Sequence, residues 1–125
     1  MPLPDSPAAP IVFHRADAFH VEKNDVDMWI YGGVDAVAPV AVAYQETATG
    51  HAQEFRHHTS AFVFYVIEGA GEWVVDGVVL PVQATDVVVV PPGAAFYYRG
   101  DLKQVCLTAP AWTEEDEEVL RQLDL

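Results

Sequence analysis

The strongest local constraint in this chain is the Asp76-Gly77 dipeptide, which separates the short apolar runs EWVV and VVL. Asp-Gly readily adopts the positive φ angles of a two-residue type I′ turn, so the segments on either side are expected to pair as a hairpin. Other short apolar runs between residues 11 and 108 are separated by Gly, Pro, Asn and Asp. This pattern predicts an all-β domain, either a closed barrel or a two-sheet jelly roll.

The same pattern predicts individual strands and one helix. Residues 87–90 are four consecutive valines, and we expect a strand buried on both faces. Residues 96–98 and 104–108 are expected to form two further strands. Near the C-terminus, Thr113 can cap a helix with an acidic first turn, and Val119, Leu120 and Leu123 would form its apolar side. We therefore expect a short C-terminal helix beside the β-domain.

The chain has the size of one domain, because 125 residues, 51% of them hydrophobic, suffice for a single core. Residues 1–10 contain four prolines and are expected to form an extended arm, with the domain spanning 11–125. The formal charge of -13 repels nucleic-acid phosphates and anionic membranes, so neither is expected as a partner. Without a leader-like segment or a membrane-length apolar run, the protein is expected to be cytoplasmic, with Cys106 as an inert core thiol.

Residues 50–100 resemble the cupin superfamily. The first cupin motif is G, five residues, H-x-H, three or four residues, E, six residues and G. Counted from Gly50, its ligand positions are Arg56, His58 and Phe62, and its last glycine is Gly69. The second motif is G, five residues, P-x-G, two residues, H, three residues and N, and its positions are held by Thr85, Pro91, Gly93, Phe96 and Gly100. The resemblance implies a cupin-type β-barrel, or jelly roll, and a homodimer formed through the exposed sheet and the N-terminal arm.

Of the four metal-ligand positions that the resemblance identifies, only His58 holds a ligand residue. A transition metal usually needs three or more converging ligands, so no metal cofactor is expected. The alternative is a divalent transition metal bound by residues close to the first motif, namely His57, His58, Glu54 and His51. A shift of one residue in register would turn His57 inward instead of His58, because neighbours on a strand face opposite sides.

The remaining motif positions predict a ligand-binding barrel. Arg56 and His58 would bind a carboxylate or phosphate of a small ligand. In the other interpretation Arg56 points outward and pairs with a surface carboxylate such as Glu54. The wall of the barrel would be formed by Phe62, Phe64, Phe96 and Tyr98. These rings either leave room for a flat or apolar ligand or fill the barrel themselves.

We therefore expect a metal-free or metal-poor cupin that binds a small organic molecule, such as one with a carboxylate. Whether it is an enzyme stays open. One alternative is a metal-dependent dioxygenase or isomerase that uses His57 and His58 with a nearby Glu or His. Another is a metal-free isomerase or cyclase that uses His58 and a tyrosine. A purely structural role is the third alternative, if the rings fill the barrel.

Overall fold

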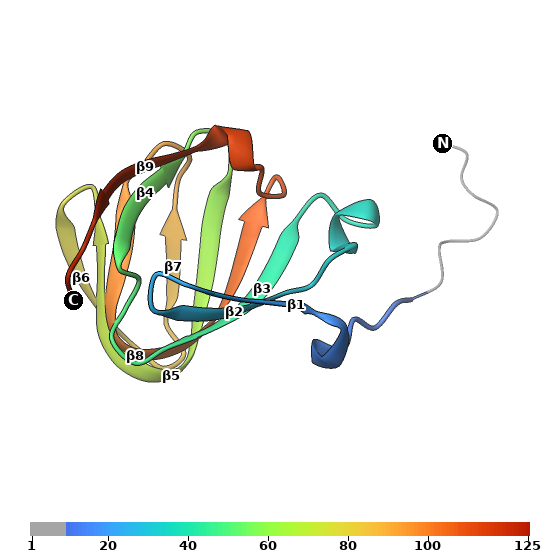
Figure 1. The fold of residues 1–125 in the computed structure, drawn as a ribbon, viewed down its shortest axis with the longest axis horizontal. Helices are drawn as coiled ribbons and strands as arrows, with labels where there is room; N and C mark the ends of the chain where they lie inside the picture. The colour runs from blue at the N-terminus through green and yellow to red at the C-terminus, as the bar shows by residue number, and fades with distance from the viewer. Residues whose placement is uncertain (1–9) are drawn as a thin grey trace.

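The computed structural model describes residues 10–125, which form nine strands and three short 3₁₀ segments (Figure 1). The strands are β1 (Phe19–Lys23), β2 (Val26–Ile30), β3 (Ala41–Thr47), β4 (Gln53–His57), β5 (Ala61–Val75), β6 (Val78–Gln83), β7 (Val87–Val90), β8 (Phe96–Ala109) and β9 (Glu117–Gln122). The 3₁₀ segments are η1 (Arg15–Asp17), η2 (Val34–Ala36) and η3 (Glu114–Asp116). The predicted all-β class is confirmed, whereas the expected proline arm lies, except for Pro10, outside the described residues.

The two long strands β5 and β8 form the spine of the sheet. They pair antiparallel from Ala61↔Ala109 to Val75↔Phe96. The C-terminal half of β8 also pairs with β3, and the sheet continues from β3 through β2 to β1. The N-terminal end of β8 pairs with β4, and β4 pairs with β9. Strand β5 pairs in addition with β6 and β7. The sheet curls around the core as a jelly-roll barrel (Figure 1), and this architecture confirms the predicted fold.

Glycines allow β5 and β8 to bend where they cross the barrel. Gly69 has a φ of 98° and Gly100 a φ of 121°, and a register shift between Val66 and Glu68 marks the bend. A Cβ on Gly69 would overlap the carbonyl oxygen of Asp101. Only glycine accommodates both the positive φ and this close backbone approach.

The predicted Asp76-Gly77 hairpin is confirmed. Val75 pairs with Val78, so two residues form the loop between β5 and β6. Asp76 and Gly77 have φ angles of 49° and 80°, as a type I′ turn requires. The Asp76 carboxylate also accepts a hydrogen bond of 2.8 Å from the backbone N–H of Ala95, which joins the turn to the segment preceding β8.

Two strand predictions need correction. In β7, Val88 and Val90 are buried, but Val87 and Val89 are 58% and 60% exposed. Strand β7 therefore buries one face only, because the outer side of this part of the sheet is not covered by any described segment. Residues 96–98 and 104–108 belong to one continuous strand, β8, since Gly100 bends the chain without ending the strand.

The predicted C-terminal helix is wrong. After Thr113 the acidic residues form only the single turn η3, and the chain continues as β9 along the edge of β4. The unpaired edge of β4 offers a full set of backbone hydrogen bonds, which outweigh a weak helical preference. Arg121 also pairs with Glu54 across these strands at 2.8 Å. No helix among the described residues is long and apolar enough to cross a membrane.

Candidate functional site

Strand β4 settles the question of register. Gln53, Phe55 and His57 are buried and face the barrel, whereas Arg56 faces outward. His58 follows the strand and is exposed, and its Nε2 lies 2.9 Å from Glu118. The nearest charged partner of Arg56 is the same carboxylate, at 3.9 Å. The expectation that Arg56 and His58 line the barrel is therefore not met, and the alternative register, with His57 inward, is the one observed.

The turn between β4 and β5 explains this difference. Four residues separate His57 from Phe62, so the longer spacing of the first cupin motif places its two histidine positions on Phe55 and His57. Both side chains point inward. Counted from Gly50, only four residues precede Phe55 where the motif has five, so the sequence count favours Arg56 and His58, and the structure decides for Phe55 and His57.

Aromatic rings occupy the position where a cupin would hold its metal. The Phe55 ring centroid lies 4.5 Å from that of Phe96 and 5.9 Å from that of Phe62, and the Phe62 and Phe96 centroids are 5.0 Å apart. Phenylalanine offers no metal-coordinating atom. This donor set does not fit a metal ion.

Both ring nitrogens of His57 bind the backbone. Nδ1 accepts the Ser60 N–H at 3.0 Å, so Nε2 carries the proton and donates it to the Thr113 carbonyl at 2.8 Å. His57 thus fastens the β4–β5 turn to the segment before η3. Within residues 10–125, no three His, Cys, Asp or Glu side chains come close enough together to hold a metal ion. The set named from the sequence, with His51 and Glu54, does not converge.

The four predicted wall residues do lie together in the core. Phe62, Phe64, Phe96 and Tyr98 are at most 6% exposed. The Trp73 ring packs among them, with centroid distances of 4.5 Å to Phe64 and 4.8 Å to Tyr98. These rings fill much of the barrel, in agreement with the alternative in which the aromatic side chains occupy the interior themselves.

His51 lies next to this cluster, and the sequence suggested it only as a candidate metal ligand. Its ring centroid is 5.7 Å from that of Tyr98. Its Nδ1 lies 2.6 Å from the Gln53 carbonyl and donates to it, which leaves the lone pair on Nε2 free to accept a proton. Desolvation by burial lowers the pKa of His51, so the imidazole is neutral near pH 7. A neutral imidazole with a free nitrogen is suited to act as a general base.

Tyr98 and two glutamines, Gln45 and Gln104, form a further polar group in the interior. The Tyr98 hydroxyl donates to Oε1 of Gln45 at 2.5 Å, and Nε1 of Trp73 donates to Oε1 of Gln104 at 3.0 Å. Burial raises the pKa of Tyr98 well above its ordinary value, so the phenol keeps its proton. The glutamines carried no sequence signal, because they lie outside both cupin motifs.

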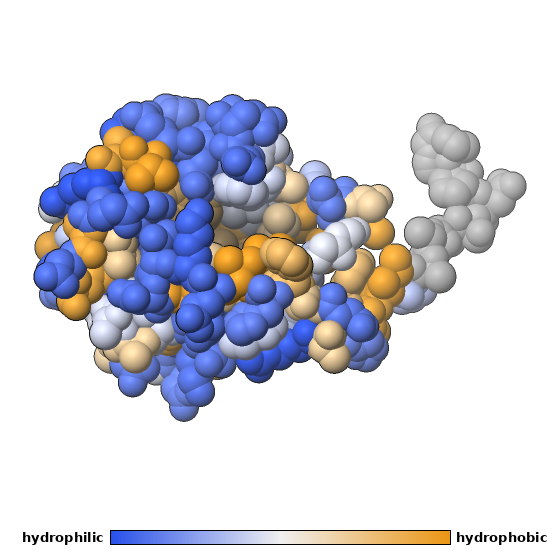
Figure 2. All heavy atoms as spheres, in the orientation of Figure 1, coloured by the Kyte–Doolittle hydropathy of each residue, from blue (hydrophilic) through white to orange (hydrophobic). Residues whose placement is uncertain are grey.

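The barrel interior is least covered on the β2–β3 side. Met28 lies two residues after the buried Val26 on β2, and Ala43 lies two residues before the buried Gln45 on β3, so both side chains face the interior. Both are only half-buried. In the orientation of Figure 1, the space-filling view shows a recess between η3 above and the β1–β2 hairpin below (Figure 2). Because Met28 pairs directly with Gln45, the inner wall next to Gln45 is the part that these half-buried side chains leave more open.

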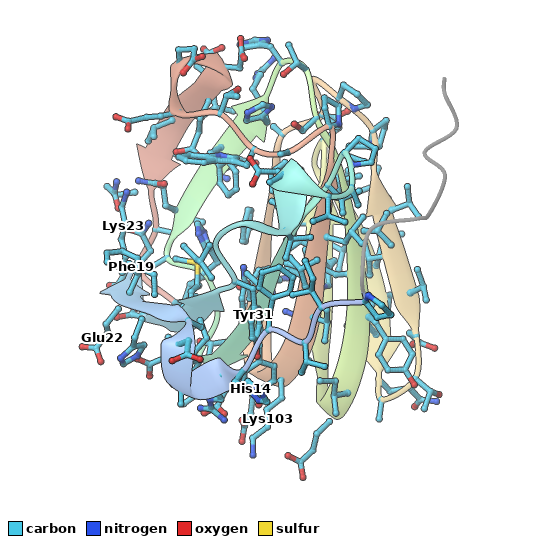
Figure 3. All side chains as sticks on the ribbon, turned by 90° about the vertical axis from the view of Figure 1, so that its right-hand side faces the viewer. His14, Phe19, Glu22, Lys23, Tyr31 and Lys103 are labelled. Carbon is cyan, nitrogen blue, oxygen red and sulfur yellow. The ribbon has the colours of Figure 1, made fainter. Side chains whose placement is uncertain are left out.

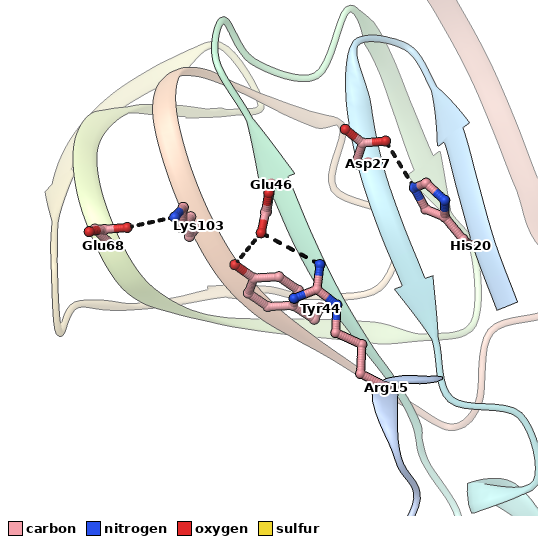
Figure 4. A network of polar contacts seen from close by, with 7 residues as sticks. All are labelled: Arg15, His20, Asp27, Tyr44, Glu46, Glu68 and Lys103. Atoms are coloured by element: carbon pink, nitrogen blue, oxygen red, sulfur yellow. Dashed lines mark hydrogen bonds and ion pairs between the residues drawn. The ribbon is translucent and has the colours of Figure 1, made fainter. Parts of the chain in front are cut away.

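All six lysine and arginine side chains lie on the outer surface. Lys23 is exposed and Lys103 projects from the periphery of the molecule (Figure 3). Five of the six have a carboxylate within 4.0 Å, and they are Arg15, Arg56, Arg99, Lys103 and Arg121. Figure 4 shows two of these pairs, Arg15 with Glu46 and Lys103 with Glu68. The barrel interior therefore offers no positive charge to an anionic ligand.

Two pockets lie outside the barrel. One, of 770 Å³, is on the rim and has charges of both signs, including Lys23, Lys103 and Glu46. The other, of 270 Å³, lies between Arg15, Tyr31 and the outer side of β3. There the Arg15 guanidinium stacks 3.9 Å above the Trp29 ring, and burial together with the hydrogen bond to Glu46 raises the pKa of Tyr44 to about 12 (Figure 4). Neither pocket contains the His51–Tyr98 pair.

Comparison with known proteins gives one family and several structural relatives. The Cupin domain family model matches residues 43–107. An uncharacterized protein of Methanocaldococcus jannaschii is 29% identical over 69 residues, which cover 52% of this chain and 55% of the relative. The chain thus matches about half the length of that curated relative.

Among solved structures, the nucleoside dehydratase Pac13 from Streptomyces is similar over nearly the whole chain. Its TM-score is 0.88 at 29% identity, covering 93% of this chain and 95% of Pac13. Three Pac13 variants, each with one histidine or tyrosine replaced, were solved with uridine and are 28 to 30% identical to this chain. Ectoine synthase from P. lautus has a TM-score of 0.71 at 17% identity, a likeness of fold alone.

Proposed function

The chain belongs to the Cupin domain family, and from that premise we propose that it is a metal-independent member that binds a neutral nucleoside in its barrel and acts on it by acid–base chemistry. The single observation that carries the proposal is the contact between His51 and Tyr98. A neutral imidazole with a free Nε2 lies there beside a protonated phenol.

The positions replaced in Pac13 support this assignment. In the three variants solved with uridine, the replaced residues are one histidine and two tyrosines. The intervals along the chain between them equal those between His51, Phe64 and Tyr98 here. In this structure the Phe64 and His51 rings both pack on Tyr98, with centroid distances of 5.9 Å and 5.7 Å. Residues at matching intervals thus form one cluster.

Phe64 marks a difference from Pac13. It stands where the interval places a tyrosine, so this chain lacks one hydroxyl. The Pac13 variant with phenylalanine in place of that tyrosine was solved with uridine, which supports nucleoside binding by a barrel with Phe64. Proton transfer in this chain would therefore depend on His51 and Tyr98 alone.

These two groups suit a dehydration. Such a reaction breaks a C–H bond and a C–O bond of the substrate, forms a C=C bond and releases water. A base must take the proton from carbon, and an acid must protonate the departing hydroxyl. Nε2 of His51 is the base, and the Tyr98 phenol, or the imidazolium once formed, is the acid. Since the metal position holds phenylalanine rings, the C–H bond would have to be acidified by a carbonyl within the substrate.

Binding and catalysis can be tested separately. Uridine is expected to raise the melting temperature of the wild-type protein and to give a saturable heat signal in calorimetry. His51→Gln and Tyr98→Phe should change the affinity for uridine without abolishing binding, since the matching Pac13 variants were solved with uridine. His58→Gln should leave the affinity unchanged, because His58 is exposed on the outer side. If uridine does not bind, or if His58→Gln has the same effect as His51→Gln, the proposal is wrong.

A nucleoside-binding protein without catalysis is the second candidate, and Phe64 is the observation that favours it. The distinction rests on turnover. Mass spectrometry would follow the loss of one water from uridine derivatives oxidised to a carbonyl on the sugar. Saturable uridine binding without water loss from any such derivative would favour the binding protein. Water loss that disappears in His51→Gln would favour the enzyme.

A homodimer is part of the proposal. On the outer side of the β7–β5 pair, Tyr65 pairs with Val87, and Val63 with Val89. Tyr65, Ile67, Val87 and Val89 are 43% to 60% exposed, and this face carries no charge across those pairs. On a chain with a formal charge of -13, an uncharged apolar face is where two copies repel each other least. A second copy is therefore the occupant that we propose.

A further inference from the structure

We propose that Gln45 and Gln104 form a pair of amide donors that binds the C4 carbonyl of the nucleobase, so that the barrel selects uracil-type bases over cytosine, which carries an amino group at C4. This inference rests on the proposed function and adds the chemical class of the base. It assigns a role in specificity to two residues outside both cupin motifs.

The two glutamines are neighbours on the inner face of the sheet. Gln45 on β3 pairs directly with Gln104 on β8, so both side chains project from the same face, with Cβ atoms about 5 Å apart. Gln45 is 8% exposed and Gln104 is 1% exposed. Two amides buried side by side need hydrogen-bond partners, because an unpaired polar group in a core is costly.

The partners within the protein bind only the oxygens. Trp73 can only donate through its indole N–H, so the Gln104 oxygen has to face Trp73 and its NH₂ group has to face away. Gln45 likewise accepts from the Tyr98 hydroxyl through Oε1. The recorded hydrogen bonds therefore leave the donors of both NH₂ groups for another acceptor.

These NH₂ groups border accessible space. Among residues 10–125, the buried side-chain atom without a hydrogen-bond partner is Nε of Arg56, so neither glutamine nitrogen is sealed in the core without a partner. Gln45 pairs with Met28 on β2, and Ala43 is the next inner residue on β3. Both are only half-buried, which places the amide donors at the part of the inner wall that a ligand can reach.

The electrostatics favour a neutral acceptor. Every lysine and arginine of the chain lies outside the barrel, and the chain as a whole is strongly negative. A phosphate or carboxylate would lose its hydration there without gaining a cation. A carbonyl oxygen accepts two N–H donors without that cost. The surrounding rings of Phe64 and Tyr98 suit the flat face of the same base.

This arrangement distinguishes the two pyrimidines. At C4, uracil has a carbonyl where cytosine has an amino group. If cytosine took the same position, its amino group would face the NH₂ groups of Gln45 and Gln104, and no acceptor would be present. A site built to hydrogen-bond one group rejects the analogue that lacks it, by factors that start at about tenfold. We expect the wild-type protein to bind uridine at least about tenfold more tightly than cytidine.

Calorimetry with uridine and cytidine tests the inference in the full-length protein. Gln45→Glu and Gln104→Glu keep an oxygen for Tyr98 and Trp73 but replace the NH₂ donor with an acceptor. Each should weaken uridine binding about tenfold or more and narrow or reverse the preference over cytidine. Gln83→Glu is the matched control, because Gln83 is exposed on β6, and it should bind like the wild type.

A second variant keeps the inference testable if the glutamate variants do not fold. If a buried glutamate prevents folding, Gln45→Met keeps the length of the side chain and removes the donor. It should lower uridine affinity about tenfold without improving cytidine binding. Equal affinity of the wild type for uridine and cytidine, or an unchanged preference in folded glutamine variants, would overturn this inference and leave nucleoside binding standing. Failure of the wild type to bind uridine would overturn the proposed function and this inference together.

Discussion

Removing the Tyr98 hydroxyl gives the sharpest test of the polar interior. Tyr98 is 1% exposed and its hydroxyl donates to Oε1 of Gln45 at 2.5 Å. Tyr98→Phe leaves that buried oxygen without its donor, at a cost of about 1 to 3 kcal/mol in the free energy of unfolding. Gln45→Met leaves the Tyr98 hydroxyl unpaired and should cost a similar amount.

The double variant separates the hydrogen bond from other effects. Once both partners are replaced by apolar groups of similar shape, no buried polar group remains unpaired, so the loss should be about 1 to 2 kcal/mol smaller than the sum of the single variants. Urea denaturation measures the three losses. With a slope of about 1 to 3 kcal/mol per molar for a chain of this size, each single variant should shift the midpoint by about 1 M.

Tyr97→Phe is the matched control for this experiment. Tyr97 precedes Tyr98 on β8 and is 8% exposed, and its hydroxyl makes no hydrogen bond with any of residues 10–125 and is not sealed in the core. Its loss should change the free energy of unfolding by less than about 0.5 kcal/mol. Strict additivity of Tyr98→Phe and Gln45→Met, or a Tyr98→Phe loss no larger than that of the control, would refute the assigned hydrogen bond and the orientation of Gln45 derived from it.

Four further results are expected. Burial lowers the folded-state pKa of His51 below 6.5, so at lower pH the unfolded chain binds a proton that the folded chain does not. The free energy of unfolding, measured in urea titrations, should therefore fall as pH drops below about 6.5. His51→Gln should make the free energy of unfolding depend less on pH. Gly69→Ala should lower the free energy of unfolding by more than about 2 kcal/mol, because the new Cβ meets the Asp101 carbonyl. Gly77→Ala has open space around it and should lower it by about 1 kcal/mol. Thermal melts should give Gly69→Ala the lower melting temperature of the two. Elemental analysis of protein purified without chelators should give far less than one metal per chain, and a stoichiometric metal would contradict the proposed chemistry. Val89→Glu places a charge on the exposed apolar face and should convert the dimer to a monomer, as measured by light scattering. A monomeric wild-type protein would show that the proposed dimer interface is wrong.

The sequence revealed more of the fold than of the site. Asp76-Gly77 favours a type I′ turn locally, so the hairpin could be predicted without knowing the remainder of the molecule. The bend at Gly69 was not predicted, because its positive φ follows from the close approach of the Asp101 backbone. The aromatic wall followed from strand periodicity. The polar interior did not, because His51, Gln45 and Gln104 come from three separate parts of the chain and meet only when β3, β4 and β8 assemble.

The sequence by itself determined the all-β class, the Asp76-Gly77 hairpin and the residue types at the motif positions, because these depend on residue type and local spacing. Only the tertiary structure decided which of His57 and His58 faces inward, since four residues separate the inward His57 from Phe62, whereas the count from His58 gives three. It also decided that the acidic C-terminal segment pairs with β4 as a strand. An open strand edge distant in sequence supplied the backbone partners that local helical preference could not match.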